Sequence, residues 1–154
     1  MSYLIPGMSN VEKTIKKAYW DLIFQELKEN NYSTIISNIS ELKSMLINLI
    51  PNRKDLHKQF DEYIDIEFLK QKFEYKLFDS KEFINLFNYI MEWLIKLGSK
   101  ADEDELRLFQ ELVIKLVEQE GYLFVLPYTF DSLHLQCSKY LEITNKIRTN
   151  SPIK

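Results

Sequence analysis

The stretch DSKEFINLFNYIMEWLIKLG, residues 79–98, contains the most apolar run of the chain and indicates the fold class. Asp79 and Glu82 have the spacing of a helix N-terminal capping box. Apolar residues then recur every three or four positions on more than one side, which predicts a helix near the centre of a bundle. Gly98 follows as the expected C-terminal cap, because glycine takes the left-handed conformation without a Cβ clash. The apolar run itself, Phe83 to Leu97, contains Glu92 and Lys96 and is shorter than the ~20 residues of a membrane crossing, so we interpret it as a buried helix.

The same spacing predicts helices on the N-terminal side of this segment. Ser9 and Glu12 again have capping-box spacing, so the first helix is expected to begin at Ser9. A second helix is expected to run from Ser33 to Pro51, where proline ends it, and Asp65 is the predicted N-cap of a short fourth helix. A third helix is predicted from Arg53 to Ile64. The apolar face expected for the first helix consists of Ile15, Ala18, Tyr19, Leu22, Ile23 and Leu27.

On the C-terminal side, the acidic run 102–105 fits the first turn of a sixth helix, and Gly121 ends it. Residues 122–130 then read as an apolar connection, since they include Pro127. This connection is interpreted either as a lid packed on the bundle or as an exposed docking patch. A last helix is predicted over 131–147. The apolar faces expected for these two helices include Leu112, Leu135 and Ile143.

Together these segments predict an all-α protein, a compact bundle of six to seven helices. The 154 residues suit one domain, and three glycines and four prolines leave little room for the many turns of a β-sandwich or barrel. We expect a flexible arm over 1–8, a single helical domain over 9–148 and a tail over 149–154.

Composition restricts the classes of partner. The net charge of −3 gives no general attraction to nucleic acid or to an anionic membrane, and the only arginines are Arg53, Arg107 and Arg148. Cys137 is the only cysteine, so an intramolecular disulfide and a cysteine-based zinc site are excluded. This cysteine usage suits a reducing compartment, and the expected location is the cytoplasm.

Two pairs of residues have spacings that catalysis or metal binding would need. His57 and Asp61 are four apart on one predicted helix face, and His134 and Cys137 are three apart. Two ligands rarely make a metal site, and a cysteine in an apolar register usually acts as a small hydrophobe. We therefore predict no catalytic residues, no metal and no cofactor, and interpret the protein as not an enzyme.

The candidate residues for partner binding lie in two places. A charged patch at the start of the third helix and an aromatic group in the apolar connection are the better candidates. A solvated helix face and a packed lid are the respective alternatives. The charged patch consists of Arg53, Lys54, Lys58, Asp61 and Glu62, and the aromatic group of Tyr122, Phe124 and Tyr128.

The stretch ELKSMLINLIPNRKDLHKQFDEYIDIEFLKQKFEYKLFD, residues 41–79, resembles the T-complex protein 11 family. It has the family's order of a helix ending in an apolar-Pro pair, a second helix, an acidic-apolar start followed by Gln and Glu, and a further cap. The later segment 133–147 is similar to another family segment, so that the resemblance covers roughly residues 33–148. Members of the T-complex protein 11 family are usually much longer than this chain. The matching positions are Leu49, Ile50, Pro51, Ile64, Asp65, Ile66, Glu67, Phe68, Leu69, Gln71, Glu74, Asp79, Leu133, Tyr140 and Glu142.

The resemblance implies an all-helical, non-enzymatic protein-binding or regulatory protein connected with the cyclic-AMP pathway. Components of the protein kinase A pathway are the partners it implies, and it supplies no catalytic residues. A second hypothesis is a structural protein that forms a homo-oligomer. A third is an enzyme, which would need His57 or His134 in a pocket beside a carboxylate.

Overall fold

The computed structural model describes residues 9–150, and all of the regular structure in this range is helical. The elements are α1 (Asn10–Lys28), α2 (Ser33–Leu49), α3 (Lys54–Tyr63), α4 (Ile66–Glu74), α5 (Ser80–Leu97), α6 (Lys100–Glu120) and α7 (Tyr122–Asn150). The predicted all-α bundle is confirmed. The expected arm over 1–8 and residues 151–154 of the expected tail lie outside the described residues, whereas 149 and 150 belong to α7.

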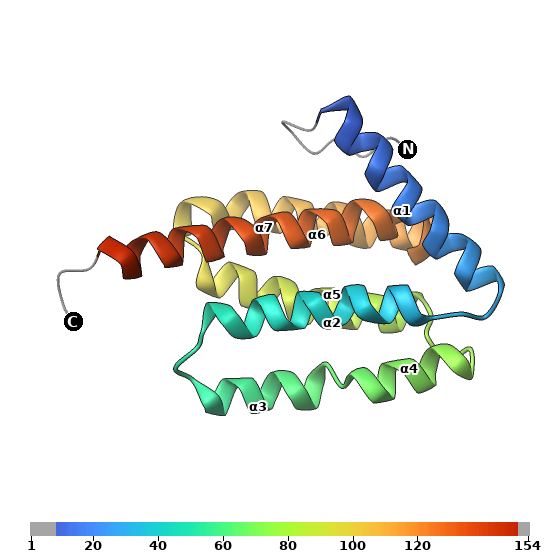
Figure 1. Cartoon of the computed structure of the whole chain (residues 1–154), viewed down its shortest axis with the longest axis horizontal. Coiled ribbons are helices and arrows are strands. Elements are labelled where there is room, and N and C mark those ends of the chain that lie inside the picture. The colour runs from blue at the N-terminus through green and yellow to red at the C-terminus, as the bar shows by residue number, and fades with distance from the viewer. Residues whose placement is uncertain (1–8, 151–154) are drawn as a thin grey trace.

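The helices form layers (Figure 1). α6 and α7 lie side by side and antiparallel in one layer, α2 and α5 form the next, and α3 and α4 cover α2 on the far side. α1 crosses one end of the bundle and contacts α2. The last turns of α7 extend past the other helices at the opposite end.

The core is centred on α2 and α5. α5 packs against α6 and α7, and it also reaches α3, where the Phe60 ring lies 4.9 Å from that of Trp93. α2 contacts α1, α3, α4 and α7 and is equally central. The predicted central position of the 79–98 helix is therefore confirmed, and its seven buried residues are Phe83, Leu86, Phe87, Ile90, Met91, Leu94 and Ile95.

Side-chain caps fix most helix starts. Ser9, Asp65 and Asp79 accept backbone N–H bonds from the residue three positions on, as predicted. The sixth helix is capped by Ser99, whose hydroxyl accepts from the Asp102 N–H at 3.3 Å. Asp102 and Glu103 lie in the first turn of α6, as predicted, and Asp104 and Glu105 follow in the second turn.

The two glycines that end helices do so for different reasons. Gly98 caps α5, but its φ of −85° is not left-handed, so the predicted reason is wrong. A Cβ at Gly98 would collide with the hydroxyl of Tyr140, so glycine is needed there for space. Gly121 has a φ of +86° and open surroundings, and this conformation separates α6 from α7.

The prediction of a non-helical connection over 122–130 is wrong. These residues are the first turns of α7, and Pro127 lies inside the helix. Proline removes one backbone hydrogen bond there, but Val125, Leu126 and Phe130 are buried at helical spacing and offset that loss. Gly121 alone makes the turn between α6 and α7, for which the sequence analysis predicted the whole segment 122–130.

The predicted apolar face of α1 is also largely wrong. Trp20 and Ile23 are the buried residues of this helix, whereas Ile15, Tyr19 and Leu22 are exposed. α1 carries apolar residues on two opposite sides, so periodicity alone could not choose between them.

Candidate functional site

An apolar groove of about 600 Å³ runs between α6 and α7 and has α5 at its base. This α6–α7 groove is defined by Met91, Leu94, Asp102, Glu105, Leu106, Leu108, Phe109, Leu112, Tyr128, Ser132, Leu133, Leu135, Gln136, Lys139, Tyr140 and Ile143. It combines the N-terminal half of α6 with the middle of α7, because the two helices are antiparallel.

The groove has a buried floor and an exposed apolar rim. Met91 and Leu94 of α5 are fully buried at its base. On the rim, Leu108 is 67% exposed, Leu112 is 47% exposed and Ile143 is 56% exposed. Exposed apolar side chains gathered around a concave surface are typical of protein docking sites.

Both walls of the groove also carry charged side chains. Asp102 and Glu105 line the α6 wall, and Lys139 lines the α7 wall. Farther along α6, Arg107 binds Glu92 of α5 at 2.6 Å and so lowers the pKa of that carboxyl. The α6 wall of the groove thus carries two carboxylates, and the α7 wall carries one ammonium group.

The sequence reading missed this groove. It assigned Leu112, Leu135 and Ile143 to buried faces, but all three are exposed. A signal was present, because α6 and α7 carry more apolar residues than one face can bury. Leu108, for example, lies beside the core positions of α6 and not among them.

The three aromatic candidates of the 122–130 segment separate in the structure. Tyr122 is half-buried against the rings of Phe78 and Phe83, and burial raises the pKa of its hydroxyl. Phe124 is exposed, whereas Tyr128 is half-buried and lines the α6–α7 groove. The segment is therefore mostly packed, and only Tyr128 joins the candidate site.

The charged candidates lie together on and beside α3, and we call them the α3 charged face: Arg53, Lys54, Lys58, Asp61 and Glu62. All five are exposed. Arg53 pairs with Asp55 at 2.9 Å, and Asp61 pairs with Lys43 of α2 at 2.8 Å. Part of this face is thus engaged in ion pairs within the chain.

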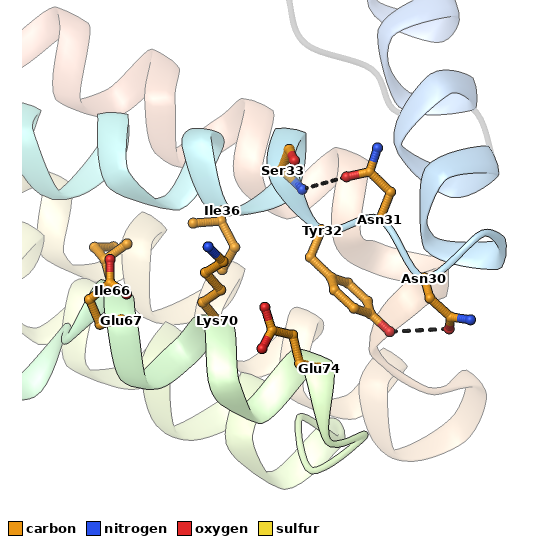
Figure 2. Close-up of a pocket in the computed structure, with 9 residues that line it drawn as sticks. All are labelled: Asn30, Asn31, Tyr32, Ser33, Ile36, Ile66, Glu67, Lys70 and Glu74. Atoms are coloured by element: carbon orange, nitrogen blue, oxygen red, sulfur yellow. Dashed lines mark hydrogen bonds between the residues drawn. The ribbon is translucent and has the colours of Figure 1, made fainter.

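Figure 2 shows a second, more polar cavity of about 400 Å³ between the start of α2 and α4. Its polar groups bond to one another: Asn31 Oδ1 accepts from the Ser33 N–H at 3.0 Å, and Tyr32 Oη donates to Asn30 Oδ1 at 3.3 Å. Exposed charged residues of α4 line the opposite wall, so the cavity is open to solvent and its polar groups at the start of α2 are already hydrogen-bonded. The remaining lining residues are Ile36, Ile66, Glu67, Lys70 and Glu74.

A buried acidic side chain fastens α1 to α7. Trp20 Nε1 donates to both oxygens of Asp131 at 3.1 Å, and Lys16 lies 3.7 Å from the same carboxylate. Burial raises the pKa of Asp131, and the hydrogen bond from Trp20 opposes that shift. The arrangement holds the inner side of α1 against the bundle.

The two histidines are tied to hydrogen-bond acceptors. His57 Nε2 donates to the Ile50 carbonyl at 2.6 Å, while Asp61 binds a lysine instead. His134 Nε2 donates to Asn38 Oδ1 at 3.0 Å, and burial lowers its pKa. Burial raises the pKa of Cys137 to about 12. Within residues 9–150, no three His, Cys, Asp or Glu side chains come together as a metal would require.

Comparison with known families identifies the chain's relatives. The model of T-complex protein 11 matches residues 7–123 of the 154-residue chain, which is more than half of it. The chain belongs to the T-complex protein 11 family. No solved structure matches.

The T-complex protein 11 match differs in extent from the resemblance seen in the sequence. It includes all of α1 and ends at the start of α7, so the segment 133–147 lies outside it. The α6 wall of the groove falls within the matched range, and the α7 wall lies beyond it. Among the helices of residues 9–150, none has the length and apolar character needed to cross a membrane.

Proposed function

We propose that this T-complex protein 11 family chain is a non-enzymatic, protein-binding regulatory domain whose docking surface is the α6–α7 groove. The observation that carries the proposal is the exposed apolar rim of that groove. Leaving Leu108, Leu112 and Ile143 in water is unfavourable, at about 25 cal/mol per Å² of apolar surface, and a bound partner would remove that cost.

The shape of the groove favours a helical partner. Two antiparallel helices leave a channel into which a third helix can lay its apolar face, with anchors spaced three and four residues apart. Leu108 and Leu112 are one turn apart on α6, and Leu135 and Ile143 are two turns apart on α7. These anchors match the period of an amphipathic helix on both walls.

Family membership suggests the class of partner. We propose a component of the cyclic-AMP and protein kinase A pathway, acting in the cytoplasm, because the resemblance to T-complex protein 11 implies that connection. T-complex protein 11 is not a known enzyme family, and the histidine and cysteine candidates are buried or bound to acceptors, which supports a binding role.

The α3 charged face is a second candidate surface. Its exposed lysines Lys54 and Lys58 lie one turn apart, and they would suit an acidic partner. Of the three aromatic candidates, only Tyr128 lines the groove, while Tyr122 and Phe124 lie outside its lining and stay candidates by themselves. The two surfaces lie on opposite layers of the bundle, so variants can test them separately (Figure 1).

The test is affinity purification of the tagged chain from its own cells, read by mass spectrometry, in three forms. They are the unaltered chain, the groove variant Leu108→Glu with Leu112→Glu, and the α3 variant Arg53→Glu with Lys54→Glu and Lys58→Glu. All the changed positions are exposed, so circular dichroism should show unchanged helix content.

We expect an identified partner to bind the unaltered chain and the α3 variant and to be lost from the groove variant. Recovery of protein kinase A pathway subunits would support the signalling assignment. Loss from the α3 variant alone would move the docking surface to α3. A partner retained by both variants would overturn both surfaces.

A further inference from the structure

A row of aromatic side chains lies where α3 and α4 meet α5. α3 and α4 follow one another in one layer and run antiparallel to α5 (Figure 1). Tyr63, the last residue of α3, is 52% exposed and stacks on Tyr89 of α5, with ring centroids 3.8 Å apart. Phe68 of α4 is 55% exposed. We call this row the aromatic seam, and its members are Tyr63, Phe68, Tyr75, Tyr89 and Trp93.

Contacts between the helices fix the position of the seam. Lys72 of α4 binds Glu82 of α5 at 2.7 Å, so this side of α4 faces α5. Phe68 and Tyr75 lie on the same side of α4 as Lys72, because they are four residues before it and three residues after it. At the other end of the seam, the ring of Trp93 packs against α3. The rings therefore follow the line between α5 and the layer of α3 and α4.

The carboxylates of α5 that lie beside the seam are already paired. Glu82 is bound by Lys72 of α4, as described above. Glu92 is bound by Arg107 of α6 at 2.6 Å, and this contact lowers the pKa of Glu92. In each pair the two charges cancel, so the net charge along the seam depends on its remaining ionisable side chains.

Two lysines remain on the exposed side of α5. Lys81 lies in its first turn, and Lys96 lies in its last turn, where its ammonium group is 5.2 Å from the centre of the Trp93 ring. Both are exposed, and within residues 9–150 neither forms an ion pair. They are separated by about 22 Å along the helix axis. The seam is thus locally positive towards both ends, although the whole chain has a net charge of −3.

We propose that the aromatic seam is the docking surface for an acidic amphipathic helix of a partner protein. The partner helix lays apolar residues along the rings and places one carboxylate beside Lys81 and another beside Lys96. Charge complementarity selects an acidic partner over a basic one, because juxtaposed like charges oppose association. None of the seam residues lines the α6–α7 groove, so the inference stands independently of the proposed function.

A single-stranded nucleic acid is the competing occupant, since bases stack on exposed rings. The structure favours the helix for two reasons. First, one face of the Phe68 ring is already covered by the ammonium group of Lys72, which lies 4.6 Å from its centre. Lys96 covers one face of Trp93 in the same way. Second, affinity for nucleic acid grows with the number of phosphates neutralised, and Lys81 and Lys96 can neutralise few.

The test uses two labelled synthetic helices of about 18 residues that share one leucine stripe. One peptide has a glutamate near each end, and the other has lysines at the same positions. Fluorescence anisotropy measures the affinity of each peptide for the whole chain. We expect the acidic peptide to bind about tenfold more tightly than the basic peptide, or better. Equal affinities would overturn the inference.

A charge reversal locates the contact. The variant Lys81→Glu with Lys96→Glu should invert the preference, so that the basic peptide binds more tightly. The matched control is Lys54→Glu with Lys58→Glu, which makes the same change in net charge on the α3 charged face and should leave the preference in place. All four lysines are exposed, so circular dichroism should show unchanged helix content. A control that inverts the preference as well would reveal a general effect of net charge and reject the seam.

The rings and the groove are tested separately. Phe68→Ser with Tyr75→Ser removes two exposed rings and should weaken binding of the acidic peptide by about tenfold or more. The groove variant Leu108→Glu with Leu112→Glu should bind this peptide as the unaltered chain does. Loss of binding in the groove variant alone would place the peptide in the α6–α7 groove and overturn the inference, while leaving the proposed function intact. A labelled single-stranded RNA that binds more tightly than the acidic peptide, and is lost from the Phe68 and Tyr75 variant, would assign the seam to nucleic acid instead.

Discussion

The α3 charged face and the α6–α7 groove are both exposed, but exposure to water is favourable for the charged side chains of α3 and unfavourable for the apolar side chains of the groove. On α3, Arg53 pairs with Asp55, Asp61 pairs with Lys43, and the remaining charges are solvated at little cost. The groove exposes leucine and isoleucine side chains, and these can be satisfied only by burial. A charged patch can thus be complete in the isolated molecule, whereas an apolar groove indicates something that the molecule lacks.

The largest expected effect separates the floor of the groove from its rim. Leu94→Ala should lower the free energy of unfolding by about 2–5 kcal/mol, because Leu94 is fully buried and its loss leaves a cavity. Leu108→Ala, on the rim, should change it by less than about 0.5 kcal/mol. Urea unfolding followed by circular dichroism measures both. A strongly destabilised Leu108→Ala would mean that the rim belongs to the core and is not a binding surface.

The next effect tests how tightly the groove end is built. Gly98→Ala should destabilise by about 1–3 kcal/mol, since the new Cβ would collide with the Tyr140 hydroxyl. The double variant with Tyr140→Phe should recover part of this loss, because it removes the nearest atom. Thermal unfolding of the two single variants and the double variant gives the coupling. Additive changes would show that the loss in Gly98→Ala does not come from contact with the Tyr140 hydroxyl.

A smaller effect is expected on the α3 charged face. Asp61→Asn should cost about 0.2–1 kcal/mol, because it breaks a pair with Lys43 in which the aspartate is largely exposed. Glu62→Gln is the matched control for a loss of negative charge at the neighbouring position. Added salt should reduce the difference between the two. A loss as large as that of Leu94→Ala would end the contrast drawn between the two surfaces.

The weakest effect concerns two titratable side chains of α7, since Asp131 binds Trp20 of α1 and His134 binds Asn38 of α2. Burial lowers the pKa of His134 below 6.5, so the folded state binds fewer protons, and stability should fall as the pH drops below about 6.5. Burial raises the pKa of Asp131 above 3.8, so stability should decline as the pH rises through that raised value.

Melting curves across pH should therefore respond oppositely to the two substitutions. His134→Gln should remove the loss of stability that occurs as the pH falls below about 6.5. Asp131→Asn should remove the loss of stability that occurs as the pH rises through the raised pKa of Asp131. If both substitutions changed the slope of melting temperature against pH in the same direction, the two groups would not titrate as their burial predicts.

The helix starts and the central position of the 79–98 helix were predictable from sequence, whereas the side of α1 that packs and the helical state of residues 122–130 were not. The caps at Ser9, Asp65 and Asp79 involve atoms three residues apart, so short patterns revealed them. Pro127 led to the prediction of a non-helical connection over 122–130, because the sequence does not show the burial that offsets the proline's lost hydrogen bond.

The candidate site depends on packing to a greater degree. Leu112 and Ile143 looked like core residues in their own helices, and only the antiparallel pairing of α6 with α7 places them on one rim. Ile15 and Leu22 of α1 were likewise taken for core residues, since periodicity does not say which of two apolar sides meets the bundle.

Cys137 has a practical consequence. It is the chain's only cysteine, it is buried, and burial raises its pKa to about 12. Thiol reagents react with the thiolate form, so the Cys137 sulfur should not react in the folded protein at neutral pH. A cysteine introduced on α1 or α6 would then be the single reactive site. The natural chain is therefore ready for one-position fluorescent or spin labelling, without first removing a native residue.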